Sequence, residues 1–147
     1  MNRRQLLLRG ALLAALAPVV RAAGMSTVVG AAAQSLDASP APLLAVLDPA
    51  YRRSREFAAA LHDRGARQLA LEPDALAAWH GTLRAACAAA PATRIVGLTT
   101  HTDFMVLRDL ARAAGYAPLA TRDADAGGAR GRATLIAWVL APRARVA

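Results

Sequence analysis

The chain has 147 residues, 56% of them hydrophobic and only 4% aromatic, so it can form one domain with its own core and does not require a second. Its formal net charge is +8, but all 18 basic residues are arginine and four lie in the first 21 residues; the other 14, against 10 acidic residues, leave a net charge of +4, too dilute for nucleic-acid binding. The single cysteine, Cys87, excludes an internal disulfide, a CxxC redox pair and a structural zinc knuckle.

Residues 1–33 have the pattern of an export signal. A start rich in arginine is followed by an apolar run at 11–20 and then by small residues, and the run is too short for a membrane-spanning helix. The sequence Arg3-Arg4-Gln5-Leu6-Leu7, with a further arginine nearby, resembles a bacterial twin-arginine signal, although Asn2 stands where serine or threonine is common. We therefore interpret Arg3 and Arg4 as the export signal.

This resemblance implies a destination and a partner. The twin-arginine export machinery would carry the folded protein across the cytoplasmic membrane, and cleavage between residues 22 and 33 would leave a periplasmic protein with no membrane span. An uncleaved anchor, or a true start at Met25, stays open as an alternative. Residues 34–42 are polar and contain two prolines, which predicts a flexible lead-in to the domain.

The first predicted unit is a strand followed by a helix. Residues 43–47 form a continuous apolar run, which is typical of a strand covered on both faces. Asp48-Pro49 predicts the start of a helix reaching about Asp63, because an aspartate can cap free N–H groups and proline fits the first helical position. Gly65 provides the exit from this helix.

The second unit is a weaker strand at 68–71 and a helix from Asp74 to just before Pro91. Helical spacing predicts a buried stripe formed by Leu76, Trp79, Leu83 and Cys87, interrupted by Gly81. Cys87 is interpreted as a small core residue rather than a nucleophile, since its alanine neighbours offer nothing to lower the pKa of a thiol. Trp79 and Trp138 are also assigned to the core.

The remaining elements complete the predicted fold. They are a strand at 94–98, a helix from about 101 to Ala114, a segment at 116–120 and a strand at 134–140. This order predicts one small three-layer α/β domain over residues 43–141, with a C-terminal tail at 142–147. We expect a mainly parallel sheet of four to five strands, in flavodoxin-like or Rossmann-like order, whose last two strands form an antiparallel hairpin.

Polar residues follow the first three strands. They are Asp48, Glu72 and the run Thr99–Asp103 within the rim segment, which we define as Gly97–Phe104 (GLTTHTDF). Because the carboxyl ends of parallel strands meet at one edge, the carboxyl rim, these groups are expected to converge. The simplest interpretation is helix capping, since Thr100 and Asp103 have capping-box spacing.

Two functional hypotheses use the same rim. In the first, hydroxyl and imidazole groups at a helix N-terminus bind a small anion such as a carboxylate or phosphate; the candidate ligand-binding residues are Thr99, Thr100, His101 and Thr102. In the second, a histidine and a carboxylate act as a general acid–base pair. The candidate catalytic residues are then His101, Asp48, Glu72 and Asp103.

Other signals argue against metal and nucleotide chemistry. His62, His80 and His101 fall on three different elements, so no metal site is expected, and no cofactor is expected either. The glycine-rich segment 127–132 lacks the preceding strand and following helix of a phosphate-binding turn, which favours a flexible loop. No serine lies in a GxSxG motif.

We therefore expect an exported periplasmic module that is noncatalytic and binds a small anionic ligand or an exported partner protein. The alternatives are a small enzyme using the histidine–carboxylate pair, and a partner domain of an exported redox enzyme.

Overall fold

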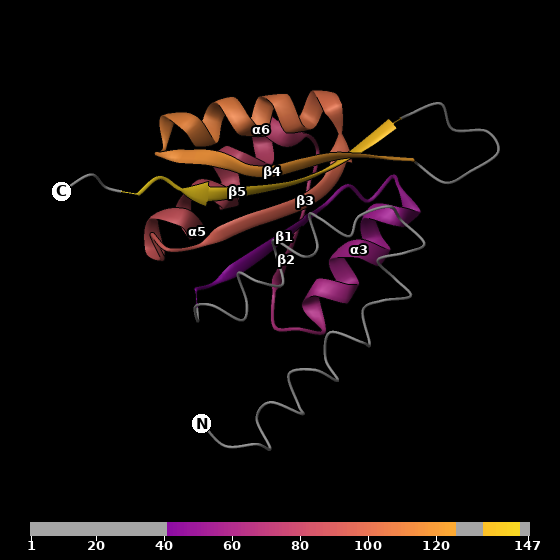
Figure 1. Cartoon of the computed structure of the whole chain (residues 1–147), viewed down its shortest axis with the longest axis horizontal. Helices are drawn as coiled ribbons and strands as arrows, with labels where there is room; N and C mark the ends of the chain where they lie inside the picture. The colour runs from indigo at the N-terminus through magenta and orange to yellow at the C-terminus, as the bar shows by residue number, and fades with distance from the viewer. Residues whose placement is uncertain (1–40, 126–133, 145–147) are drawn as a thin grey trace, which may run out of the picture.

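The computed structural model of the chain describes residues 41–125 and 134–144, and in them a five-stranded sheet is flanked by helices (Figure 1). The strands are β1 (Leu43–Leu47), β2 (Arg67–Ala70), β3 (Arg94–Thr100), β4 (Tyr116–Asp125) and β5 (Thr134–Pro142). The helices are α3 (Arg52–His62), α4 (Ala75–Ala78), the π-helical turn η1 (Trp79–Leu83), α5 (Arg84–Ala89) and α6 (His101–Ala113). The predicted export signal, most of the lead-in and the predicted glycine-rich loop lie outside the described residues.

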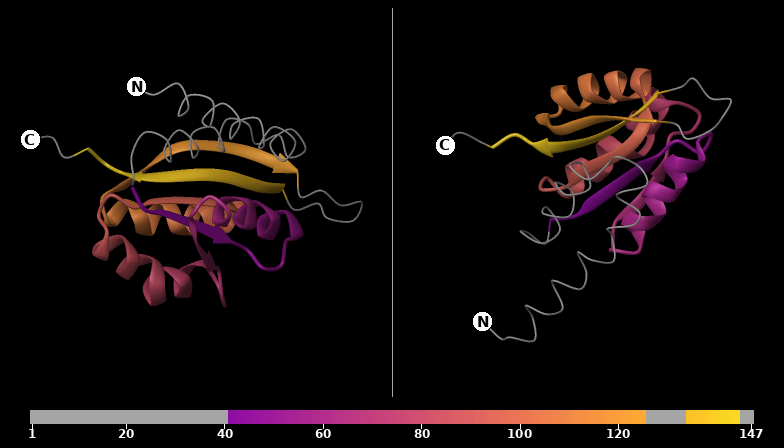
Figure 2. Two further views of the ribbon diagram at one scale, coloured as in Figure 1. Left: turned by 90° about the horizontal axis from the view of Figure 1, so that it is seen from below. Right: turned by 45° about the vertical axis from the view of Figure 1, so that its right-hand side comes forward.

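The strand order is β2-β1-β3-β5-β4. β1 pairs in parallel with β2 and β3, whereas β5 is antiparallel to both of its neighbours. The predicted small α/β domain and its terminal antiparallel hairpin are confirmed, but the sheet is only partly parallel, and the flavodoxin-like order is not confirmed. β4 and β5 lie side by side, with β4 at the edge (Figure 2).

Burial explains why β5 rather than β4 takes the interior position. Every residue from Leu135 to Leu140 is buried, so both faces of β5 need cover. β4 contains Pro118, which cannot donate to a strand ladder, as well as the exposed Leu119 and the charged Arg122 and Asp123. Proline and charge suit an edge strand, where one side of the backbone faces away from the sheet.

Each face of the sheet has its own core, because successive side chains of a strand point to opposite faces. α3 packs its buried Phe57, Ala58 and Leu61 on one face, and this core also contains Ala45, Val96, Ala137 and Val139. α4, η1, α5 and α6 pack on the other face, and this core contains Trp79, Leu83, Cys87, Phe104, Leu107 and Trp138. The predicted core positions of Trp79, Trp138 and Cys87 are confirmed.

Two predicted helix details are wrong. α3 begins at Arg52, and its N-cap residue, Tyr51, makes no side-chain capping bond. Asp48 does not cap the helix, because its Oδ1 accepts a hydrogen bond from the N–H of Ala50 at 3.0 Å, within a turn that precedes α3. The predicted burial of Leu76 is also wrong, since this side chain is 51% exposed.

The phase of α4 leaves Leu76 exposed. Asp74 is the N-cap of α4, since its Oδ1 accepts from the N–H of Ala77 at 2.8 Å, and α4 places Ala75 and Ala78 against the core. Trp79 and Leu83 of η1 then continue the buried stripe that begins at Ala75. Within residues 41–125 and 134–144, no helix is both long and apolar enough to cross a membrane.

Candidate functional site

The rim segment is built around the indole of Trp138. Gly97 on β3 pairs with Trp138 on β5, and a Cβ atom at position 97 would lie 2.3 Å from Cζ2 of the indole. Phe104 packs against the same indole, with its ring centroid 5.6 Å from that of Trp138. The first and last residues of the rim segment therefore serve the packing of one buried tryptophan.

Thr99 lies in the same buried arrangement. Its side chain is fully buried, and Oγ1 accepts a hydrogen bond from Nε1 of Trp138 at 3.0 Å while donating to the carbonyl of Thr100 at 3.1 Å. A buried indole N–H without an acceptor would be unfavourable, so Thr99 supplies what Trp138 requires. This predicted ligand-binding hydroxyl is placed in the core and not on the surface of the carboxyl rim.

Thr100 is the N-cap of α6. Its Oγ1 accepts from the N–H of Asp103 at 3.2 Å and donates to Oδ2 of Asp103 at 2.7 Å. The carboxylate also lies in the first turn of α6, where the positive end of the helix dipole favours negative charge. The capping interpretation is confirmed for this pair.

The carboxyl rim brings together only some of the predicted catalytic residues. Burial raises the pKa of Asp48 above its ordinary value, the hydrogen bond from Ala50 opposes this, and the negative charge of Asp103 adds to the increase. Asp48 and Asp103 are therefore close enough to interact. His101 and Glu72 are exposed, and within the described ranges neither side chain forms a hydrogen bond or ion pair, so no histidine–carboxylate pair is assembled.

The remaining predicted residue, Thr102, is exposed on the first turn of α6. The three histidines lie on α3, η1 and α6, and no group of three or more histidine, cysteine or acidic side chains comes together in the described part of the chain.

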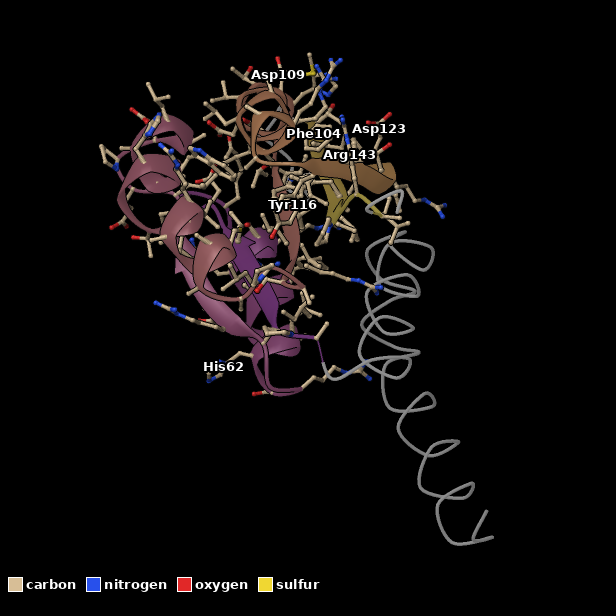
Figure 3. All side chains as sticks on the ribbon, turned by 90° about the vertical axis from the view of Figure 1, so that its left-hand side faces the viewer. His62, Phe104, Asp109, Tyr116, Asp123 and Arg143 are labelled. Carbon is tan, nitrogen blue, oxygen red and sulfur yellow. The ribbon has the colours of Figure 1, made fainter. Side chains whose placement is uncertain are left out.

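A hollow lies at the end of the sheet opposite the carboxyl rim. This hollow, which we call the α5–β5 pocket, has a volume of about 540 Å³ and is bounded by α5, the turn between α6 and β4, and the end of β5. Its lining residues are Arg84, Cys87, Ala88, Pro91, Ala114, Gly115, Tyr116, Pro142, Arg143 and Ala144. Figure 3 looks onto this end of the molecule, where Tyr116 and Arg143 are both found.

Strand pairing assembles two walls of the α5–β5 pocket. Tyr116, the first residue of β4, is the register partner of Pro142 near the end of β5. The backbone N–H of Arg143 donates to the carbonyl of Gly115 at 2.8 Å, and Gly115 turns the chain with a φ of 88°. Arg143 is thus fixed beside the turn between α6 and β4.

The α5–β5 pocket contains an unpartnered polar group. Tyr116 is 4% exposed, and among the described residues its buried hydroxyl has no partner at hydrogen-bond geometry; the polar group that interacts with it is the weakly hydrogen-bonding thiol of Cys87. Burial raises the pKa of this hydroxyl well above its usual range, and the neighbouring Cys87 thiol adds to the effect. Burial also raises the pKa of Cys87, which argues against a reactive thiolate, although the tyrosine hydroxyl opposes the shift.

The charged groups of the α5–β5 pocket are both arginines. Within residues 41–125 and 134–144, no acidic residue lines the pocket, and neither Arg84 nor Arg143 forms an ion pair. A second hollow of about 250 Å³ shares Arg84 and Ala114 with this pocket and continues over η1 and α6 to His80. Arg84 therefore lies between two concave surfaces.

Sequence reasoning missed Arg84, Tyr116 and Arg143 as a group. They are far apart in the chain, and Cys87 was interpreted only as core. The signal that could have joined two of them is the predicted hairpin, because pairing its strands from their outer ends places Tyr116 opposite Pro142.

Comparison of the chain with protein-family models, with curated proteins and with solved structures finds no match.

Proposed function

We propose that this chain is an exported, noncatalytic periplasmic module that binds a small molecule in the α5–β5 pocket. One observation carries the proposal: the Tyr116 hydroxyl is buried without a partner in the wall of a pocket that also contains two arginines without ion pairs in the described structure. Its volume is in the range of small-molecule sites, and mostly apolar walls with a few polar groups are typical of such sites.

Stability alone does not explain this arrangement. A buried hydroxyl without a partner lowers the free energy of unfolding by about 1–3 kcal/mol, and nearly all buried polar groups in proteins find partners. A phenylalanine at position 116 would avoid this penalty. Residues that lower stability in this way are typical of binding sites, where the partner is the ligand.

Binding can be tested by a thermal-shift screen of the full-length chain against carboxylates, phosphates, nucleotides and divalent metals. A ligand at a hundred times its dissociation constant stabilises the folded state by about 2.7 kcal/mol, which raises Tm by several degrees. We expect at least one hit that is lost in Arg143→Met and kept in Thr100→Val. The reverse pattern would place the site at the carboxyl rim and contradict the proposal.

Export through the twin-arginine pathway is the second part of the proposal, and Arg3 and Arg4 are the residues that support it. Changing both to lysine keeps the charge and removes the arginine pair. We expect cell fractionation to show the wild-type chain in the periplasm and the double variant in the cytoplasm. A matched double variant at Arg52 and Arg53 should be exported normally. Periplasmic recovery of the Arg3/Arg4 variant would contradict this part.

An acid–base enzyme at the carboxyl rim is the second candidate function; the proximity of Asp48 and Asp103 supports it, whereas His101 forms no hydrogen bond or ion pair with either carboxylate among the described residues. It differs from the first in one measurable way. If the rim is catalytic, His101→Ala or Asp48→Asn abolishes turnover while ligand binding persists. If the chain is a binding module, neither substitution changes the affinity for the ligand, and no turnover is measured in the wild type.

A further inference from the structure

The chemistry of the α5–β5 pocket indicates the class of molecule that it binds. Arg84 lines it from α5 and Arg143 from the residue after β5, so two different walls each contribute an arginine, and none of the lining residues in the described part of the chain is acidic. Guanidinium groups pair with carboxylates and phosphates through two parallel hydrogen bonds, which favours an anionic ligand.

The rest of the lining requires a ligand with a carbon body. Ala88, Pro91, Ala114, Pro142 and Ala144 all contribute apolar surface. An inorganic anion would leave this surface in contact with water, whereas a compact apolar group would cover it, and burial of apolar area is the main source of affinity in such sites.

The orientation of α5 and α6 favours a ligand with one negative charge over a ligand with two. Pro91 and Ala114 follow the C-terminal ends of α5 and α6, and both line the α5–β5 pocket. The C-terminal end of a helix carries partial negative charge, and phosphates are usually bound at the opposite, positive end. A singly charged carboxylate meets less repulsion here than a phosphate that carries close to two charges.

We propose that the α5–β5 pocket binds a small organic monocarboxylate with a compact apolar body. The guanidinium groups of Arg84 and Arg143 bind the carboxylate, the alanine and proline residues contact the apolar body, and the Tyr116 hydroxyl donates to a carboxylate oxygen once the Cys87 side chain turns aside. This inference rests on the proposed binding function and adds the class of ligand.

Tyr116 gives the inference a signature that a purely structural role would not produce. Tyr116→Phe removes a buried hydroxyl without a partner, so the unliganded variant should have a Tm equal to or above that of the wild type. The same change removes a donor to the ligand, so the dissociation constant should rise severalfold. Higher stability with weaker binding in one variant is the expected result.

The experiment is isothermal titration of the full-length chain with benzoate, with benzamide as its neutral counterpart of the same shape, and with inorganic phosphate, up to about 10 mM. Benzoate should bind at least tenfold more tightly than either of the others. Arg143→Met and Arg84→Met, which keep much of the apolar stem, should each weaken benzoate binding about tenfold or more. Arg67→Met, at the other edge of the sheet on β2, is the matched control and should bind benzoate as the wild type does.

Several results would overturn the inference, and they separate it from the proposed function. If benzamide binds as tightly as benzoate and both are lost in Arg143→Met, the requirement for a carboxylate is wrong while the binding site stands. If phosphate binds more tightly than benzoate and this binding is lost in Arg143→Met, the ligand is a phosphate and not a monocarboxylate. Benzoate binding that is absent, or unchanged in both arginine variants, would overturn the inference, and the broader thermal-shift screen then decides the proposed function on its own.

Discussion

The two ends of the sheet use their polar residues differently. At the carboxyl rim, the rim segment contains many polar side chains, and Thr99, Thr100 and Asp103 are all hydrogen-bonded within the fold. At the α5–β5 pocket, polar residues are few, and the Tyr116 hydroxyl has no partner. In a dense run of polar residues, capping and packing can therefore account for most of the buried or partly buried groups, whereas a ligand site is better indicated by buried polar groups that the fold leaves without partners.

The largest effect is expected from Gly97→Ala, which tests whether the rim segment is tied to Trp138. The added Cβ would lie 2.3 Å from the buried indole, and the indole cannot move without losing its bond to Thr99. We expect the free energy of unfolding, measured by urea denaturation, to fall by about 3 kcal/mol. Gly81→Ala is the control, because a Cβ there meets nothing within 4 Å, and it should be neutral or stabilising. A wild-type urea midpoint for Gly97→Ala would show that the two are not coupled.

Thr99→Val comes next in size. The valine keeps the shape of the side chain but leaves the buried Trp138 Nε1–H without an acceptor, so the free energy of unfolding should fall by about 1–3 kcal/mol. Thr99→Ser keeps the hydroxyl and should lose less. In a Trp138→Phe background the effect of Thr99→Val should shrink, because its partner is already absent. Equal losses with and without Trp138 would contradict the assigned hydrogen bond.

Thr100→Ala should lower the free energy of unfolding by about 1 kcal/mol through the lost N-cap of α6. Thr102 lies two residues further on and is exposed, so Thr102→Ala should change stability by less than about 0.5 kcal/mol. Thermal denaturation of both variants measures the difference. Equal destabilisation by the two changes would mean that Thr100 has no special capping role.

Asp48→Asn should have a small effect of opposite sign that depends on pH. The pKa of Asp48 is higher in the folded state than in the unfolded state, so protonation of this side chain favours folding. This contribution to the free energy of unfolding is complete below the unfolded-state pKa of about 3.9. It is lost as the pH rises through the folded-state pKa. The asparagine can still accept from Ala50, so the variant should be slightly more stable than wild type at pH 7. The difference should narrow toward pH 3.

Asp103→Asn provides the test of that explanation, because it removes the neighbouring negative charge. In that background, the gain from Asp48→Asn at pH 7 should be smaller. A difference between Asp48→Asn and wild type that is the same at pH 3 and pH 7 would contradict an electrostatic origin.

The smallest effect on stability is expected at the α5–β5 pocket. Arg143→Met removes a guanidinium group that forms no ion pair within the described residues, while the backbone N–H of residue 143 can still donate to Gly115. Unliganded, the variant should differ from wild type by less than about 0.5 kcal/mol in thermal denaturation. A loss as large as that of Thr100→Ala would mean that both ends of the sheet use their polar residues for stability.

The features that sequence reasoning predicted correctly depend on neighbouring residues. The strand at 43–47, the Thr100 cap and the burial of Trp79 and Cys87 all follow from local patterns of apolar, capping and helical spacing. Asp48 shows the limit of such patterns, because an aspartate before proline can close a turn as readily as it can cap a helix. The local sequence does not show which of the two occurs, because the outcome depends on the direction of the following helix.

The features that it missed depend on distant contacts. The strand order was decided by the competition of β4 and β5 for an interior position, and the exposure of Leu76 by the packing of Ala75 and Ala78, rather than Leu76, against the core. The α5–β5 pocket joins Arg84, Tyr116 and Arg143 through strand pairing and helix packing, which no local window of the sequence contains.

The insertion of β5 between β3 and β4 also determines when the domain can fold. As the chain leaves the ribosome, β1, β2 and β3 emerge early and can pair, but β4 has no partner in the described sheet until β5 follows. Trp138 and its neighbours on β5 contribute to the cores on both faces, so both remain incomplete until about residue 142 has been synthesised. Until then β3 presents an open strand edge, which is a site for aggregation. The β3 edge is therefore covered only once β5 has been synthesised and has paired with it.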